Sequence, residues 1–164
     1  MRYFQEPLYS EVLPNLFISG TLDEDIVQRG NFHDYAEKPA FESVVCMYVY
    51  ANPMGHGVRE QRYGIPDAKL SEDRKPEILE LARWLHSEWK AGKRVAGKCQ
   101  AGLNRSSLIV ALVLVEEGFS AAESINLIRA KRSPNALCND SFVSFIYEVF
   151  ESKSRSAEKT KLLQ

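Results

Sequence analysis

Apolar residues recur at helical spacing in one long segment of the chain, Lys75 to Ala91. The large side chains that lie three or four residues apart are Ile78, Leu81, Leu85 and Trp89. This spacing places them on one face of a helix. Pro76 suits the first turn of that helix and Gly92 the residue past its end. The pattern therefore predicts an amphipathic helix whose apolar stripe belongs to the core.

The rest of the chain alternates short runs typical of β-strands with helical patterns. Strands are predicted over residues 12–19, 41–49 and 94–99, and helices over 22–30, 105–118, 120–130 and from 139 or 140 to about 150. Pro14-Asn15 breaks or bends the first strand near its start, and Ser120 to Glu123 is a capping box. Residues 51–64 are rich in glycine and predict a loop with at most a short strand. This order predicts an α/β fold, a central and mostly parallel sheet of about four to five strands with helices on both faces.

Composition places the chain among ordinary globular proteins. Its 164 residues are 45% hydrophobic and 26% charged, which predicts a single domain over residues 1–152 and a charged C-terminal tail over 153–164. A net charge of −1 gives no reason to expect nucleic acid as a partner. No apolar run approaches the ~20 residues of a membrane span, and the first residues lack the apolar core of a signal peptide. The pattern leaves the oligomeric state open.

Cysteine and histidine positions bear on compartment and cofactors. The three cysteines, at 46, 99 and 138, are an odd number without the spacing of metal ligands, which favours a reducing cytoplasm. The three histidines, at 33, 56 and 86, share no ligand spacing either. We therefore expect neither a metal ion nor another cofactor.

The stretch from Cys99 to Arg105 carries the candidate chemistry. A thiol closes a strand-like segment, a tight loop with Gly102 follows, and an apolar helix begins at an arginine. Backbone N–H groups of such a loop and the helix N-terminus attract an anion, and the same field favours thiolate over thiol. Arg105 offers a bidentate fork for two phosphate oxygens. A lone cysteine is more often a small buried side chain, but this context favours a nucleophile. The residues expected to bind phosphate are Gln100, Ala101, Gly102, Leu103, Asn104 and Arg105.

The loop resembles the signature His-Cys-x5-Arg-Ser/Thr of the cysteine-dependent protein tyrosine phosphatases, and is most similar to that of the small dual-specificity phosphatases. The residues that match it are Cys99, Gly102, Arg105 and Ser106. Looser matches are residues 12–20, Ile65-Pro66-Asp67 and residues 132–142, so the resemblance spans roughly residues 10 to 150. It implies hydrolysis of phosphate monoesters on phosphorylated protein or peptide. It also implies that Cys99 forms a cysteinyl-phosphate intermediate and that Ser106 donates to its sulfur.

The reaction also needs a proton donor for the leaving oxygen, on a separate loop. Asp67 lies 32 residues before Cys99, and Asp73 lies 26 residues before it. The resembled family places its acid roughly thirty residues upstream after a short apolar stretch with proline, which favours Asp67. Asp73 directly precedes the long predicted helix, where an acid is also expected as a partner of the helix dipole.

Lys98 is the main departure from the family, which has histidine at that position. The side chain of a strand residue next to Cys99 points to the opposite face of the sheet, so Lys98 need not touch a substrate. A charged lysine accepts no hydrogen bond, so it cannot reproduce the histidine's network. Some relatives protect the nucleophile through a disulfide with a nearby cysteine. Cys46 is a candidate for such pairing, although a buried structural role is favoured over it.

Several functions compete with the phosphoprotein phosphatase. An RNA 5′-phosphatase is one, because such relatives also carry asparagine where this chain has Asn104. A phospho-binding pseudophosphatase with weak activity is another, because of Lys98. A sulfur transferase of the rhodanese type is more remote, since the Arg-Ser ending and the upstream aspartate favour phosphate. The uncharged residues Gln100, Ala101, Leu103 and Asn104 argue against a highly charged lipid head group.

Overall fold

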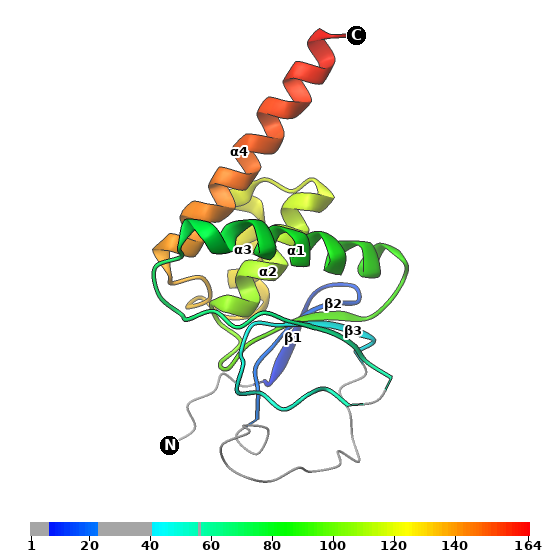
Figure 1. The fold of residues 1–164 in the computed structure, drawn as a ribbon, viewed down its shortest axis with the longest axis vertical. Helices are drawn as coiled ribbons and strands as arrows, with labels where there is room; N and C mark the ends of the chain where they lie inside the picture. The colour runs from blue at the N-terminus through cyan, green and yellow to red at the C-terminus, as the bar shows by residue number, and fades with distance from the viewer. Residues whose placement is uncertain (1–6, 23–40, 56) are drawn as a thin grey trace.

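One five-stranded sheet organises the structure, a computed structural model that describes residues 7–22, 41–55 and 57–164 (Figure 1). The strands are β1 (Tyr9–Leu13), β2 (Leu16–Ser19), β3 (Ser43–Cys46), β4 (Arg59–Arg62) and β5 (Val95–Lys98). Their order in the sheet is β1-β2-β5-β3-β4, and every neighbouring pair is parallel except β1 and β2. The predicted α/β class and mostly parallel sheet are thus confirmed, with β5 at the centre.

The first predicted strand is in fact a hairpin. Residues 12–19 were expected as one strand, but β1 and β2 pair antiparallel around Pro14 and Asn15. Asn15 has a φ of 67°, a left-handed conformation that asparagine adopts more readily than most residues. The turn is held further by the side chain of Glu11, which accepts a hydrogen bond from the backbone N–H of Asn15 at 2.9 Å. Strand β4 lies within the region predicted as a loop with a short strand.

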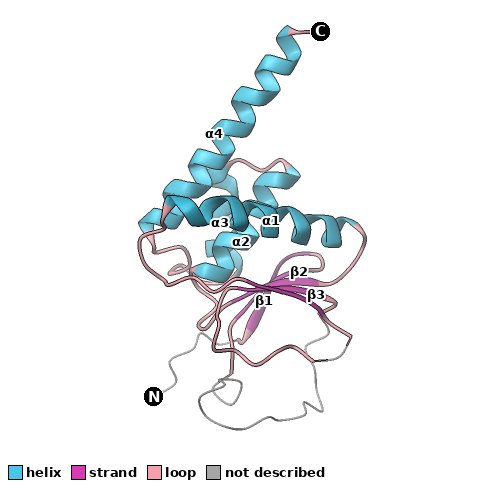
Figure 2. Ribbon diagram, in the orientation of Figure 1, coloured by secondary structure: helices cyan, strands magenta, loops and turns pink. Residues whose placement is uncertain are grey.

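The helices of the described part all lie on one face of the sheet (Figure 2). They are α1 (Lys75–Lys90), α2 (Arg105–Glu117), α3 (Ala121–Lys131) and α4 (Asp140–Leu162), and a 3-10 helix, η3 (Glu72–Arg74), precedes α1. The expectation of helices on both faces is not met within the described residues. There the opposite face carries a small apolar cluster, against which Met54 and Val58 pack from the loop before β4.

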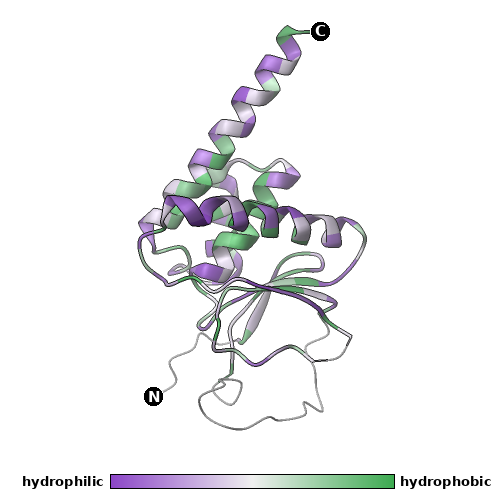
Figure 3. Ribbon diagram, viewed as in Figure 1, coloured by the Kyte–Doolittle hydropathy of each residue, from purple (hydrophilic) through white to green (hydrophobic). Residues whose placement is uncertain are grey.

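Helix α2 is the centre of the core. All residues from Ser106 to Val115 are buried, and Figure 3 shows the hydrophobic colour of this helix between the sheet and its neighbours. The helix lies close against β5 because residue 97 is glycine. A Cβ there would come within 2.7 Å of the backbone oxygen of Ser106 and 3.0 Å of Val110. The thin strand therefore lets α2 approach the sheet.

The C-terminal elements follow the predicted capping signals. The capping box between Ser120 and Glu123 is formed, and the side chain of Asn139 caps α4. The segment 153–164, expected as a charged tail, is helical almost to its end because α4 extends to Leu162 (Figure 1). Residues 155–164 are exposed, whereas Lys153 is half-buried and donates to Glu116 at the end of α2. The boundary at residue 152 stays a prediction. The helix expected over 22–30 lies almost wholly outside the described residues. Among the described helices, none is both long and apolar enough to span a bilayer.

Candidate active site

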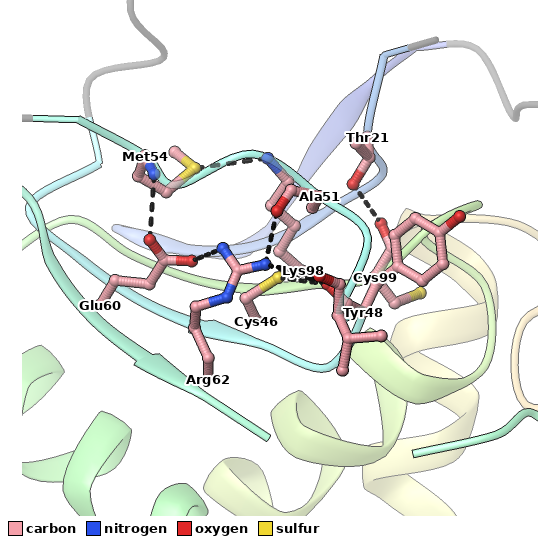
Figure 4. A network of polar contacts seen from close by, with 10 residues as sticks. Thr21, Cys46, Tyr48, Ala51, Met54, Glu60, Arg62, Lys98 and Cys99 are labelled. Carbon is pink, nitrogen blue, oxygen red and sulfur yellow. Dashed lines mark hydrogen bonds and ion pairs between the residues drawn. The ribbon is translucent and has the colours of Figure 1, made fainter. Parts of the chain in front are cut away.

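The thiol of Cys99 lies directly after the carboxyl end of the central strand β5. Its backbone N–H donates to the carbonyl of Ser19 on β2 at 3.1 Å. Its carbonyl accepts from the hydroxyl of Thr21 at 2.8 Å (Figure 4). The end of a central parallel strand is where open α/β sheets bind ligands. The hydrogen bonds to Ser19 and Thr21 fix the point at which the loop leaves the sheet.

The loop from Cys99 to Arg105 turns around the sulfur. The backbone N–H of Gly102 donates to the Sγ atom of Cys99 at 3.3 Å, and the Oγ atom of Ser106 lies 3.2 Å from the same sulfur. Cys99 is 2% exposed, so its sulfur lies at the floor of the loop. In this arrangement the Cys99 thiol donates to the Ser106 oxygen. If the thiol loses its proton, the hydroxyl and the Gly102 N–H are both placed to donate to the sulfur, which suits a negative charge there.

Arg105 begins α2, as predicted, and its side chain contacts two segments outside the loop. Its guanidinium donates to the carbonyl of Ile65 at 3.2 Å and lies 5.2 Å from the ring centre of Tyr48. The Nε atom of Arg105 is buried and has no hydrogen-bond partner in the described part of the chain. A buried donor of this kind is rare in native proteins and marks a place for an acceptor.

Gly102 adopts a φ of +69°, a conformation that favours glycine. A Cβ at this position would lie 2.7 Å from the Nη2 atom of Arg132 and 2.7 Å from the backbone nitrogen of Gly20. Glycine at this position therefore allows the turn and also leaves room for the side chain of Arg132.

Arg132 holds the loop from behind and was not singled out as a site residue from the sequence. The residue is 5% exposed, and its guanidinium uses its five N–H donors within the protein. The acceptors are the carbonyls of Gly102 (2.9 Å), Ala101 (3.4 Å), Pro7 (2.6 Å) and Leu8 (3.3 Å) and the hydroxyl of Ser10 (3.0 Å). Burial lowers the pKa of Arg132 from its ordinary value, and the nearby Cys99 sulfur opposes that effect.

Asp67, the favoured proton donor, lies beside the loop. It is exposed, on the segment between β4 and η3, and one of its carboxylate oxygens accepts from the side-chain amide of Asn104 at 2.9 Å. Asp73 lies in η3 at the start of α1, the place expected for a partner of the helix dipole. Of the two candidates, it is Asp67 that the fold brings to the loop from Cys99 to Arg105.

Lys98 points away from the Cys99 sulfur, as expected for a neighbouring strand residue. Its Nζ atom lies 3.3 Å from the Sδ atom of Met54, on the face of the sheet opposite the Cys99 sulfur (Figure 4).

Cys46, the register partner of Lys98 on β3, is a free thiol whose sulfur contacts the carbonyl of Tyr48 at 3.4 Å. Burial raises the pKa of Cys46, although the Tyr48 contact, Arg62 and Lys98 oppose it. Both residues thus belong to the far face of the sheet.

Known protein structures resemble this one closely in fold, although their sequence identity with this chain is low. The structure matches human DUSP28 with a TM-score of 0.76 at 19% identity, over 93% of this chain and 99% of that one. The chain has the fold of a small dual-specificity phosphatase. The active form of Tk-PTP matches with a TM-score of 0.68 at 24% identity, over 90% of this chain and 99% of that one. This agreement confirms the fold that the sequence resemblance implied.

The same fold also occurs in a protein described as phosphatase-like. The human tyrosine phosphatase-like serine/threonine/tyrosine-interacting protein matches with a TM-score of 0.67 at 16% identity, over 86% of this chain and 94% of that one. The dual-specificity phosphatase fold alone therefore does not decide between a catalyst and a binding protein.

Matches at the level of sequence are sparse. No family model matches the chain. The protein named "Putative tyrosine phosphatase 123R", from Invertebrate iridescent virus 6, is 29% identical in an 85-residue alignment that covers 46% of this chain. The match spans 60% of the length of that viral protein.

Proposed function

We propose that this chain is a phosphate monoester hydrolase that needs no metal ion and acts on phosphoprotein, on phosphotyrosine and on phosphoserine or phosphothreonine, through a cysteinyl-phosphate intermediate. One observation carries the proposal. The buried Cys99 sulfur accepts from the Gly102 N–H and lies 3.2 Å from the Ser106 hydroxyl oxygen, just before a helix that begins with Arg105. The three free cysteines at 46, 99 and 138 suit a reducing compartment, so we also propose a cytoplasmic location.

In the first step, the Cys99 thiolate attacks phosphorus. A sulfur–phosphorus bond forms as the bond to the ester oxygen breaks, and Asp67 gives its proton to that leaving oxygen. Arg105 and the loop N–H groups hold the three remaining phosphate oxygens, whose charge they stabilise most as it shifts in the transition state. In the second step, a water molecule attacks phosphorus and gives its proton to Asp67. Ser106 donates to the departing sulfur, and inorganic phosphate leaves.

Substrate binding on this proposal changes the partners of Arg105. Its guanidinium exchanges the carbonyl of Ile65 for phosphate oxygens, and its buried Nε atom gains an acceptor. Since the guanidinium fork matches two phosphate oxygens, a lysine at residue 105 does not replace it.

The test is hydrolysis of a small aryl phosphate in the presence of a chelator. Cys99→Ser and Arg105→Lys are expected to abolish turnover, and Asp67→Asn to lower it by about 10²–10⁴-fold. Cys46→Ala is the matched control and keeps its turnover, because that thiol lies on the other face of the sheet. Vanadate inhibits the wild type, and mass spectrometry after acid quenching detects one phosphoryl group on Cys99. Turnover that survives Cys99→Ser contradicts the proposal.

A binding module is the second candidate, because Lys98 replaces the family's histidine and its side chain contacts Met54 instead of the loop. Its signature is phosphopeptide binding by the wild type that depends on Arg105, without turnover of any phosphate ester. An RNA 5′-phosphatase, the other alternative, would release phosphate from RNA 5′ ends much faster than from phosphopeptides.

A further inference from the structure

The turn that follows β3 presents two large apolar side chains to solvent. Val49 is 56% exposed and Tyr50 is 47% exposed. They are the corner residues of a tight turn, the β3 turn (residues 48–51), in which the backbone N–H of Ala51 donates to the carbonyl of Tyr48 at 3.3 Å. Glycine, proline, asparagine, aspartate and serine dominate such positions. Valine and tyrosine therefore give this turn an apolar outer surface that its backbone does not require.

The β3 turn leaves the sheet at the same edge as the phosphate-binding loop. Strands β3 and β5 are parallel neighbours, and the backbone N–H of Met47 donates to the carbonyl of Lys98 at 2.8 Å. Beyond that point, the ring centre of Tyr48 lies 5.2 Å from the guanidinium carbon of Arg105. The ring centre of Tyr50 lies 5.6 Å from that of Tyr48. The exposed apolar surface is therefore continuous with the candidate active site.

Val49 extends this surface toward the segment that carries Asp67. Its side chain lies over Gly64, because a Cβ at residue 64 would overlap the Cγ1 atom of Val49. Gly64 directly precedes Ile65, whose carbonyl accepts from Arg105 at 3.2 Å. Val49 thus lies between the β3 turn and the segment of the candidate acid.

Arg62 holds the β3 turn by its carbonyl groups (Figure 4). Its Nη2 atom donates to the carbonyls of Tyr48 and Val49, each at 3.3 Å, and to the carbonyl of Ala51. Its Nη1 atom donates to the carboxylate of Glu60 at 2.8 Å. A turn that is held in this way presents its side chains without the ordering cost that a flexible loop pays on binding.

We propose that Val49 and Tyr50 bind a large apolar side chain that lies near the phosphorylated residue of the substrate, and that Arg62 is the positioning residue for this contact. The inference rests on the proposed function and adds a feature of the substrate. With its phosphate at Arg105, an extended peptide advances about 3.3–3.6 Å per residue, so a side chain one to three positions away reaches the β3 turn. The preferred substrates are then phosphopeptides with a residue such as leucine at one of these positions.

The measurement compares two phosphotyrosine peptides of equal length and charge. One carries leucine at the three positions on each side of the phosphotyrosine, and the other carries serine there. Apolar contact with a substrate group changes kcat/KM by about tenfold or more. We therefore expect the wild type to have a kcat/KM at least about tenfold higher for the leucine peptide than for the serine peptide.

Substitutions in the β3 turn should remove this preference. Val49→Ser and Tyr50→Ser each lower the ratio of the two kcat/KM values, and the double variant brings it to about one. Tyr147→Ser is the matched control, because Tyr147 is a tyrosine on α4 with a similar exposure of 41%, and it keeps the wild-type ratio.

Arg62 is tested by a disruptive and a conservative change. Arg62→Ala lowers the ratio because the turn loses its donor. Arg62→Lys keeps most of the ratio, because the three carbonyls accept from one nitrogen atom and lysine also offers three donors at one nitrogen. A purely structural role of Arg62 would lower kcat/KM for both peptides alike and leave their ratio unchanged, which contradicts the positioning role.

Peptide binding to Cys99→Ser, measured by fluorescence anisotropy, distinguishes this inference from the proposed function. If the wild type hydrolyses both peptides equally well, or if Val49→Ser and Tyr50→Ser leave the ratio unchanged, the inference is wrong and the phosphatase proposal stands. If neither peptide is hydrolysed but the leucine peptide binds about tenfold more tightly, and Tyr50→Ser removes that difference, the phosphatase proposal fails and the apolar contact stands. If neither peptide is hydrolysed or bound, both fail.

Sedimentation velocity tests a second copy of the chain as the occupant of this surface. Self-association that Tyr50→Ser abolishes, together with equal kcat/KM values for the two peptides, would assign the surface to a contact between copies and overturn the inference.

Discussion

Replacing Arg132 by lysine tests how the phosphate-binding loop is held. The guanidinium donates to five acceptors, two of them carbonyls of the loop itself, at Ala101 and Gly102. A lysine has three donors at one nitrogen, so at least two of these acceptors lose their partner. Because the site is buried, water does not readily replace the missing bonds.

The expected loss of stability follows from those two acceptors. Leaving a buried polar group without its partner costs about 1–3 kcal/mol, so Arg132→Lys lowers the free energy of unfolding by about 2–6 kcal/mol. Domains of this size have a total of about 5–15 kcal/mol. At about 2–4 °C per kcal/mol, the Tm falls by roughly 4–24 °C.

Thermal unfolding and turnover of an aryl phosphate are the two assays. At a temperature well below both transitions, we expect kcat to fall by about tenfold or more, because the Gly102 N–H no longer faces the Cys99 sulfur in a fixed position. Arg129→Lys is the control. Arg129 lies in the last turn of α3, just before Arg132, and donates to the carbonyls of Ala136 and Leu137, outside the loop, so kcat stays at the wild-type value. An Arg132→Lys protein with wild-type Tm and kcat would refute the reasoning.

Three further substitutions test separate parts of the structure. Gly102→Ala places a Cβ within 2.7 Å of two atoms at a φ of +69°, so we expect turnover to be lost while vanadate no longer binds, as isothermal titration can measure. Ser106→Ala removes a hydroxyl 3.2 Å from the Cys99 sulfur; rapid-quench kinetics should show the second step slowed by about 10-fold or more and the phosphoenzyme accumulating, and equal slowing of both steps would contradict the assigned role. Glu88→Gln lowers the free energy of unfolding by about 1–2 kcal/mol at pH 7, measured by urea unfolding. Burial alone would raise the pKa of Glu88, but hydrogen bonds from Lys93 and Ser43 and the charge of Arg59 outweigh it and hold that pKa below its ordinary value. The stabilisation is therefore present above the unfolded pKa of about 4.3 and is lost as the pH falls through the folded pKa, so the two proteins converge in acid; a difference that persists there contradicts the assignment.

Much of the fold could be predicted because local signals agree with the tertiary structure. The stripe from Ile78 to Trp89 gave α1, and the capping box at Ser120 gave the start of α3. The β1–β2 hairpin was missed because its turn, Pro14-Asn15, interrupts a run that otherwise looks like one strand. Strand β4 was predicted only as a possible short strand within a loop, because its residues are all polar and largely exposed. The outer part of α4 carries polar residues on every side, a pattern that a helix and a loose tail share (Figure 3).

The site was predictable where its residues are close in sequence. The stretch from Cys99 to Ser106 forms one loop, so spacing alone indicated it. Asp67 lies 37 residues from Asn104, and no local pattern links the two. Arg132 likewise contacts carbonyls more than a hundred residues away, at Pro7 and Leu8. Such contacts depend on the chain path, which the sequence pattern alone does not fix.

The buried position of α2 has a consequence for how this protein tolerates change. The helix that ends the phosphate-binding loop is also the one enclosed on all sides, from Ser106 to Val115. A smaller side chain in the interior, at Leu112 for instance, leaves a cavity beside α2. A shift of α2 into that cavity also moves Arg105 at its first turn. Interior packing and anion recognition are thus tuned by the same piece of backbone. Variants with a loosened centre should lose selectivity for phosphate before they lose their shape.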